Sequence, residues 1–281
     1  MDMLLYLSLY GILQGCTEVL PVSSAGHVAI MRQIFHFHEF NWELLPALQI
    51  APLLAVALYF HQDLGLLIAG FRSSLPAARS WMHGGPNPFV LTGEQNIPYF
   101  MALNFGSVIL ETWLLEDISD QVFERADWVS FFLLINAILL RIATLGPRGE
   151  RTIKELELRD FLFIILIQGL AMIPGVSRLG ILICAGLLLR MNLQQAFKLA
   201  FLLLIPVIAA NFLLHSDELL FLLKRDPQLI NALILAMCAT AMFSFIGLHF
   251  LTSRVMDRQK LAFFSSYCLI IGLTAFIYLQ F

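Results

Sequence analysis

The segment QGCTEVLPVSSAGH, which begins at Gln14, places several polar side chains inside a hydrophobic part of the chain. Gln14 and Glu18 are four residues apart and share a helix face, where an amide oxygen and a carboxylate could both turn toward a divalent cation or a water. If a helix begins at Ser24, the imidazole of His27 shares a face with its hydroxyl, within reach of proton transfer or of one phosphate oxygen. These residue types predict acid–base or nucleophilic chemistry.

A second segment, PGVSRLG, begins at Pro174 and contributes Arg178. The guanidinium offers a fixed fork of donors that suits a phosphate or a carboxylate. Helices that start after PVS and PGVS also direct free backbone N–H groups toward the centre of the protein, and helix N-termini attract anions. We therefore expect an anion between the two segments. A purely structural ion pair between Arg178 and Glu18 is the competing interpretation.

Helices that cross a membrane must position these polar segments. Of the 281 residues, 59% are hydrophobic and 13% are charged, and the mean hydropathy is +0.81. This composition is typical of an all-α integral membrane protein rather than of a soluble domain. Apolar runs near the length needed to cross the bilayer predict six transmembrane helices. These runs cover residues about 44–60, 98–115, 127–145, 197–214, 228–251 and 261–280.

The pattern around the polar segments occurs twice. Residues 12–30 and residues 166–183 share the order apolar, Gln-Gly, apolar, Pro, Val-Ser, small, Gly, apolar, and three long apolar runs follow each copy. Because the number of crossings between the copies is odd, we predict an inverted repeat. The single membrane domain, residues 1–281, then consists of repeat one at about 1–145 and repeat two at about 158–281.

Each polar segment interrupts its helix. Pro and Gly break helical hydrogen bonding, and an irregular turn inside a membrane is tolerated only where protein or water surrounds it. We therefore predict two re-entrant helical hairpins, which with the six transmembrane helices give ten helical segments. The hairpins comprise residues 3–18 with 24–35, and residues 160–173 with 178–190.

Lys and Arg gather on one face of this predicted topology, which the positive-inside rule assigns to the cytoplasm. Both termini then lie outside, the first hairpin enters from outside, and the second enters from inside. The hydrophilic connection at about 72–97 becomes a cytoplasmic loop, and Trp42, Trp113 and Trp128 fall at the outer interface.

The remaining composition indicates no further chemistry. The net charge is −3 and the basic residues are scattered, so no nucleic acid partner is expected. The four cysteines lack the spacing of a metal site and are interpreted as small buried hydrophobes. They are Cys16, Cys184, Cys238 and Cys268.

The repeat symmetry is expected to bring the polar turns together around one negatively charged group. Four residues are our candidates for catalysis: Glu18, Ser24, His27 and Arg178. Four are candidates for binding the substrate phosphate: Ser23, Gly26, Ser177 and Arg178. Gln14 and Glu18 are the candidate metal ligands.

Both polar segments resemble the signature motifs of the undecaprenyl pyrophosphate phosphatase family, also called bacitracin resistance proteins. The stretches LQIAPLLAVALYF and FLLLIPVI after the two motifs are also similar, so the resemblance covers essentially the whole chain. It implies inverted repeats with paired re-entrant hairpins and removal of the terminal phosphate from a polyprenyl pyrophosphate lipid. It also implies an essential carboxylate at Glu18, an active-site serine and histidine at Ser24 and His27, and a phosphate-binding arginine at Arg178.

The same resemblance implies help from a divalent metal, Mg²⁺ or Ca²⁺, and a place in the bacterial cytoplasmic membrane, with the reaction at its outer face. The product would be the lipid carrier, recycled for cell-wall synthesis, and a homodimer is among the expected assemblies. The chain departs from the family pattern at Leu179 and Leu182, where Ser and Thr are usual, and at Lys198, where Glu is frequent. These departures bear on substrate identity, metal dependence and rate.

Two mechanisms follow, and one different function competes with them. In the first, Ser24 attacks phosphorus while Glu18 or His27 relays protons; in the second, Glu18 activates a water and Ser24 binds phosphate. The rival function is a transporter or flippase for polyprenyl phosphate or another anionic lipid, because inverted repeats with opposed half-helices are also a transport architecture. A protein whose polar turns only stabilise its fold is the remaining alternative.

Overall fold

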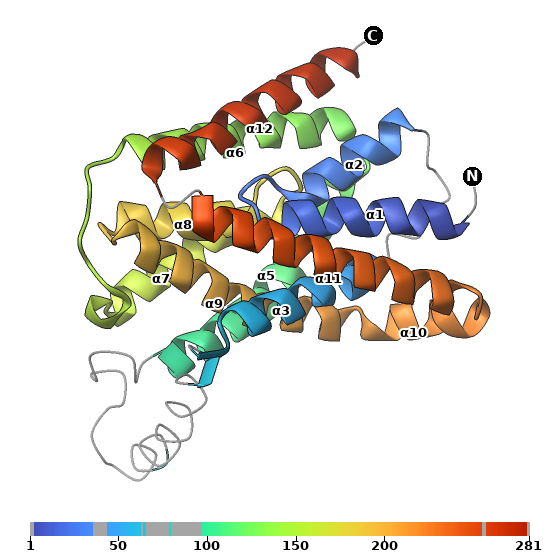
Figure 1. Cartoon of the computed structure of the whole chain (residues 1–281), viewed down its shortest axis with the longest axis horizontal. Coiled ribbons are helices and arrows are strands. Elements are labelled where there is room, and N and C mark those ends of the chain that lie inside the picture. The colour runs from blue at the N-terminus through green and yellow to red at the C-terminus, as the bar shows by residue number, and fades with distance from the viewer. Residues whose placement is uncertain are drawn as a thin grey trace.

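The computed structural model describes residues 3–35, 44–62, 64, 65, 79, 97–254 and 257–279, and its regular structure within these ranges is helical (Figure 1). The first half contains α1 (Met3–Glu18), α2 (Ser24–Ile34), α3 (Leu45–Tyr59), α5 (Ile97–Phe123) and α6 (Ala126–Leu145). The second half contains η4 (Ile153–Glu155), α7 (Leu158–Gln168), η5 (Gly169–Met172), α8 (Arg178–Leu188), α9 (Leu193–Leu214), α10 (Ser216–Arg225), α11 (Leu229–Arg254) and α12 (Arg258–Tyr278). The predicted loop at 72–97 and Trp42 lie mainly or wholly outside the described residues.

Four of these helices, α6, α9, α11 and α12, are long and apolar enough to cross a membrane. The protein is therefore a multi-pass membrane protein. The other two predicted spans also correspond to helices, but α3 has only 15 residues and α5 carries acidic side chains along its 27 residues.

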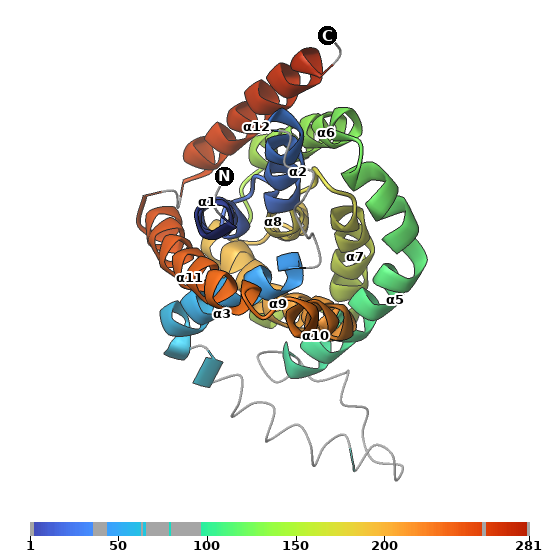
Figure 2. The same cartoon turned by 90° about the vertical axis from the view of Figure 1, so that its right-hand side faces the viewer.

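The first polar segment ends one helix and begins another, as predicted. Pro21 has no N–H and disfavours helical geometry in the residue before it, so α1 stops at Glu18. The chain then turns back, because Leu7 and Tyr10 of α1 share one hydrophobic cluster with Val28 of α2. The two helices lie together at one end of the molecule, where α1 begins and α12 ends (Figures 1 and 2).

The second polar segment also folds back, at the opposite end of the molecule (Figure 1). Arg151 ties the two ends of this hairpin together: its guanidinium donates to a carboxylate oxygen of Asp160 at 2.6 Å, in the first turn of α7, and to the carbonyl of Leu189 at 3.1 Å, just after α8. The hairpins therefore enter the molecule from opposite ends, and their turns meet near its middle.

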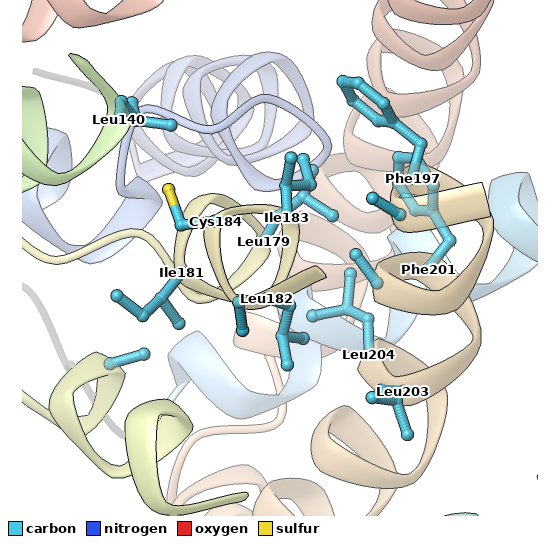
Figure 3. Packing of buried hydrophobic residues seen from close by; sticks show 14 of the residues in the cluster. Leu140, Leu179, Ile181, Leu182, Ile183, Cys184, Phe197, Phe201, Leu203 and Leu204 are labelled. Atoms are coloured by element: carbon cyan, nitrogen blue, oxygen red, sulfur yellow. The ribbon is translucent and has the colours of Figure 1, made fainter. Parts of the chain in front are cut away.

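The hydrophobic core holds these turns in place. Helix α8 packs against α9, with Ile183 toward Phe197 and Leu182 toward Leu204 (Figure 3). Helices α6 and α12 pack side by side over the turns, and α11 lies along both α1 and α3.

Helix α10 was not predicted from the sequence. Its buried residues Leu219 and Leu222 pack into the same cluster as α1, while Phe221 is 67% exposed. The segment is amphipathic and too short to cross a bilayer, which explains why hydropathy alone does not predict a helix here.

Candidate active site

The turns of the two hairpins touch each other at a pair of glycines. A Cβ atom added to Gly26 would lie 3.1 Å from the Cα of Gly175. Gly175 has a φ of +106°, and its own Cβ would lie 2.5 Å from the carbonyl oxygen of Val129 in α6. Glycine is required there both for the backbone conformation and for the close approach.

Glu18, at the end of α1, is 8% exposed and makes two side-chain hydrogen bonds through one carboxylate oxygen. The Oε2 atom accepts from Gln14 Nε2 at 2.7 Å and from Ser24 Oγ at 2.5 Å. The first contact follows from the four-residue spacing on α1, and the second from the turn that places the first residue of α2 above the end of α1. The structure thus brings together three of the residues that the sequence indicated.

His27 lies on α2 but contacts a different set of groups. Its Nδ1 lies 2.8 Å from the carbonyl oxygen of Ser23, and its Nε2 lies 2.9 Å from the hydroxyl of Tyr267 in α12. Because a carbonyl can only accept, Nδ1 carries the proton, and in a neutral ring Nε2 then accepts from the tyrosine. Within the described residues, no hydrogen bond joins His27 to Ser24.

Tyr267 gave no signal in the sequence. It is one polar residue within an apolar run, and only the packing of α12 over the first hairpin reveals its partner.

The two half-helices begin with the same side-chain cap, although the φ of Ser23 is +66° and that of Ser177 is −79°. The hydroxyl of Ser23 accepts from the N–H of Gly26 at 3.2 Å, and the hydroxyl of Ser177 accepts from the N–H of Gly180 at 3.1 Å. Both serines are N-caps, so the next residues, Ser24 and Arg178, occupy equivalent first positions of α2 and α8. A role of Ser23, Gly26 and Ser177 in binding phosphate stays a prediction.

Arg178 begins α8 and lines a cavity to which Ala25 of α2 also contributes. Across the part of the chain that the structure describes, it forms no ion pair, and its hydrogen bond is to the sulfur of Met172 at 3.5 Å. The charges of Glu18 and Glu111 nevertheless act on it from nearby. A cation next to a carboxylate but not bonded to it remains available to an anion.

Asn136 of α6 holds both turns at once. It is 1% exposed, its Nδ2 donates to the carbonyl of Pro21 at 3.3 Å, and its Oδ1 accepts the backbone N–H of Ser177 at 3.0 Å. The same Nδ2 lies 3.5 Å from the sulfur of Cys268 in α12. A lone Asn within a hydrophobic run gives no local motif, so the sequence analysis did not identify it.

A cavity of about 220 Å³ opens beside Arg178. Polar groups from α3, α5 and α9 line it together with apolar residues of the second turn. Among the polar lining residues are Gln49, Thr112, Glu116, Ser119, Asn211, Arg178 and His215. Two hydrogen bonds brace its wall, between Asn211 and Gln49 at 2.5 Å and between His215 and Glu116 at 3.0 Å.

The residues proposed for a metal have the right donor chemistry. The Oε1 atom of Gln14 is buried and has no hydrogen-bond partner within the described structure, whereas the Nε2 atom of the same amide donates to Glu18, so the amide must turn over before both oxygens face one cation. No cluster of three or more His, Cys, Asp or Glu residues suited to a metal occurs in the described ranges. Two oxygen ligands fit a hard divalent cation that takes its remaining ligands from phosphate and water.

Two of the departures from the signature motif lie in the core. Leu179 is 1% exposed and Leu182 is 2% exposed, and both belong to the hydrophobic cluster shown in Figure 3. Neither residue lines the cavity beside Arg178. The third departure, Lys198, lies on α9.

Comparison with known proteins gives consistent results. The family model described as bacitracin resistance protein BacA matches residues 7–274. The chain is 30% identical over 277 residues to the undecaprenyl-diphosphatase of Geotalea daltonii, which covers 98% of this chain and 97% of that relative. It is 32% identical over 283 residues to undecaprenyl-diphosphatase 2 of Halalkalibacterium halodurans, covering 95% and 93% of the two chains. It is also 32% identical over 274 residues to undecaprenyl-diphosphatase 3 of Bacillus anthracis, covering 96% and 95%.

Proposed function

The chain belongs to the bacitracin resistance protein family, and from this premise we propose how its two turns hydrolyse undecaprenyl pyrophosphate to the monophosphate and inorganic phosphate. The observation that carries the proposal is the hydrogen bond from Ser24 Oγ to Glu18 Oε2 at 2.5 Å. A hydroxyl that donates to a buried carboxylate has its lone pairs directed elsewhere and its proton acceptor already in place.

In the first step, Ser24 Oγ forms a bond to the terminal phosphorus while Glu18 takes its proton. The bond between that phosphorus and the bridging oxygen breaks, and undecaprenyl phosphate leaves with the bonding electrons. A water oxygen then bonds to the phosphorus of the phosphoserine, the bond from phosphorus to Ser24 Oγ breaks, and Glu18 returns its proton to Oγ, which releases inorganic phosphate and restores the Ser24 hydroxyl.

Arg178 neutralises charge on the phosphoryl oxygens during this transfer. Its guanidinium has no carboxylate ion pair among the described residues, and it begins α8, whose N-terminus adds a favourable dipole. Ser24 begins α2 in the same manner, so the reacting phosphate lies between two helix N-termini.

His27 has a positioning role in this mechanism. Its bond to the Ser23 carbonyl fixes the backbone next to the nucleophile, and Tyr267 fixes the ring from the other side. The leaving group is a phosphate monoester of low proton affinity, so no general acid is needed for its departure.

We further propose that Gln14 and Glu18 hold a divalent cation, Mg²⁺ or Ca²⁺. When bound, the cation would supply positive charge to the diphosphate. The unpartnered Oε1 of Gln14 supports this assignment.

The finer topology is also part of the proposal. Six transmembrane helices and two re-entrant hairpins, in inverted repeats at about 1–145 and 158–281, would place both termini and the reaction at the outer face of the bacterial cytoplasmic membrane. The opposed hairpins support this arrangement. Recycling of the lipid carrier follows from the product, whereas a homodimer stays a prediction.

The test is release of inorganic phosphate from undecaprenyl pyrophosphate by the purified protein in detergent with Mg²⁺ or Ca²⁺. Rapid quenching with substrate labelled at the terminal phosphorus should trap label on Ser24. Label that appears only in free phosphate, with a Ser24→Ala variant that retains most activity, would replace the serine nucleophile with an activated water. Binding or lipid flipping without phosphate release would support the transporter instead.

A further inference from the structure

A polar pocket of about 470 Å³ lies at one end of the molecule, where three long helices meet. Helix α6 ends there, and both α9 and α12 begin there (Figure 1). The guanidinium of Arg258, the first residue of α12, donates to the carbonyl of Gly146, just after α6, at 2.5 Å. All three helices are long and apolar enough to cross a membrane, so the pocket lies at the ends of membrane-spanning segments.

Two arginines line this pocket and a third lies beside it. Arg148 and Arg258 belong to the lining, and so does Gly149. A Cβ atom on Gly149 would lie 1.9 Å from the carbonyl oxygen of Arg190, which places the third arginine against the pocket wall. The positive charges of Arg148 and Arg190 both act on the Arg258 guanidinium. Within the described ranges none of the three forms an ion pair, so their mutual repulsion is not relieved by a carboxylate partner there.

The acidic residue in the pocket lining has another task. Asp257 is the N-cap of α12, and its carboxylate accepts the backbone N–H of Gln259 at 3.0 Å. Glu150 follows Gly149 in the chain but does not line the pocket. The N-termini of α9 and α12 add partial positive charge, because their helix dipoles point toward this end. The pocket therefore carries a surplus of positive charge and favours an anion.

The surroundings of the pocket indicate which kind of anion it accepts. Exposed apolar side chains lie next to it along two of the helices, with Leu145 of α6 exposed by 70% and Phe263 of α12 by 67%. The ends of membrane-spanning helices lie at the depth of lipid phosphate groups, and basic pockets between such helices bind lipid head groups. A soluble anion would need no apolar surface beside its site.

We propose that this pocket, which we call the arginine pocket, binds the phosphate of an anionic phospholipid, whose acyl chains lie along α6 and α12. Guanidinium groups offer paired N–H donors that match phosphate oxygens. The inference goes beyond the proposed function and does not depend on it, because neither hairpin turn contributes a residue to the lining.

The experiment titrates short-chain phosphatidylglycerol into the purified, delipidated full-length protein in detergent and measures the increase in Tm. Phosphatidylcholine of the same chain length is the zwitterionic comparison, and inorganic phosphate is the soluble one. Phosphatidylglycerol should stabilise the wild type more than phosphatidylcholine does. Arg148→Gln should raise the phosphatidylglycerol concentration for a half-maximal increase about tenfold, because the variant loses a charged donor to phosphate.

Two further variants separate a built site from general attraction between a basic surface and an anionic lipid. Arg141→Gln removes the same charge from an exposed position on α6 that does not line the pocket, and its half-maximal concentration should stay near that of the wild type. Asp257→Asn keeps a cap for α12 but removes the negative charge from the lining. It should lower the half-maximal concentration several-fold.

The arginine pocket is overturned if Arg148→Gln and Arg141→Gln weaken the phosphatidylglycerol effect equally, because the attraction is then diffuse. It is also overturned if phosphatidylglycerol stabilises the wild type no more than phosphatidylcholine does. If inorganic phosphate gives an increase that depends on Arg148 while phosphatidylglycerol gives none, the pocket takes a soluble anion and the assignment to a lipid fails.

Discussion

The side-chain oxygen of Asn136 accepts the backbone N–H of Ser177 at 3.0 Å, directly before the arginine that begins α8. Its nitrogen donates to Pro21 in the other turn. One amide on a transmembrane helix therefore sets the distance between the hairpin that bears Ser24 and the hairpin that bears Arg178.

Asn136→Ala should lower kcat at least about tenfold and destabilise the protein by about 1–3 kcal/mol, because it removes the partner of the Ser177 N–H and leaves the Pro21 carbonyl only the weak donor of Cys268. Asn104→Ala is the matched control. Asn104 is equally buried and donates to the carbonyl of Leu203 at 3.0 Å, away from the turns. It should lower Tm with little change in kcat, and equal kcat losses in the two variants would show that Asn136 has no special positioning role.

Ser24→Ala should reduce phosphate release by about 1,000-fold or more, because no other hydroxyl bonds Glu18 in the described structure. Glu18→Gln should cause a comparable loss, since an amide cannot take the proton. A double variant with both changes should release phosphate only slightly more slowly than either single variant, and steady-state kinetics measures the three rates. Fully additive losses would mean that the two residues act in separate steps.

Arg178→Met should lower kcat/KM about 100-fold or more while leaving Tm unchanged or higher, because the described structure gives the guanidinium no ion pair to lose. Arg151→Met provides the opposite case. Arg151 joins Asp160 and Leu189, so its loss should lower Tm. A fall in Tm with Arg178→Met as large as that with Arg151→Met would assign Arg178 a structural role.

Gln14→Glu should lower the concentration of Mg²⁺ or Ca²⁺ needed for half-maximal activity by about tenfold, because a second carboxylate adds charge to the proposed ligand pair. Gln14→Met should raise it. Chelation of divalent cations should abolish activity in the wild type. Titration of metal back into the assay then gives the half-maximal concentration for the wild type and the two variants. Identical metal curves would remove Gln14 from the cation site.

Gly15→Ala should destabilise the protein by about 1–3 kcal/mol, because the added methyl group would meet the backbone of α11. Gly106→Ala, on α5, is the control: nothing lies within 4 Å of its added Cβ, so stability should stay the same or rise. Thermal unfolding in one detergent compares them. Similar Tm values for the two variants would show that α1 and α11 pack less tightly than described.

The two turns and the contact between Gln14 and Glu18 could be predicted from the sequence, because both depend on local rules. Pro21 and Gly175 interrupt helices wherever they occur, and a four-residue spacing aligns side chains on any helix. Asn136 and Tyr267 were missed because each is a single polar residue in an apolar run. Their partners lie on other helices, and only tertiary packing shows which polar residue faces a turn.

His27 illustrates the same limit from the other direction. The spacing of three residues does place it on α2 near Ser24, but its ring nitrogens bond the Ser23 backbone and Tyr267 instead of the Ser24 hydroxyl. The choice between these partners depends on α12, which lies more than 200 residues later in the chain.

Ser24 and Arg178 stand at the same place in two matching helix starts, and this equivalence limits how such a centre can evolve. A half-length ancestor assembled with an inverted copy of itself would display either two hydroxyls or two guanidiniums there, never one of each. A hydroxyl in one half and a guanidinium in the other therefore require two copies of the half that mutate independently, and fusion in one chain keeps the two copies together.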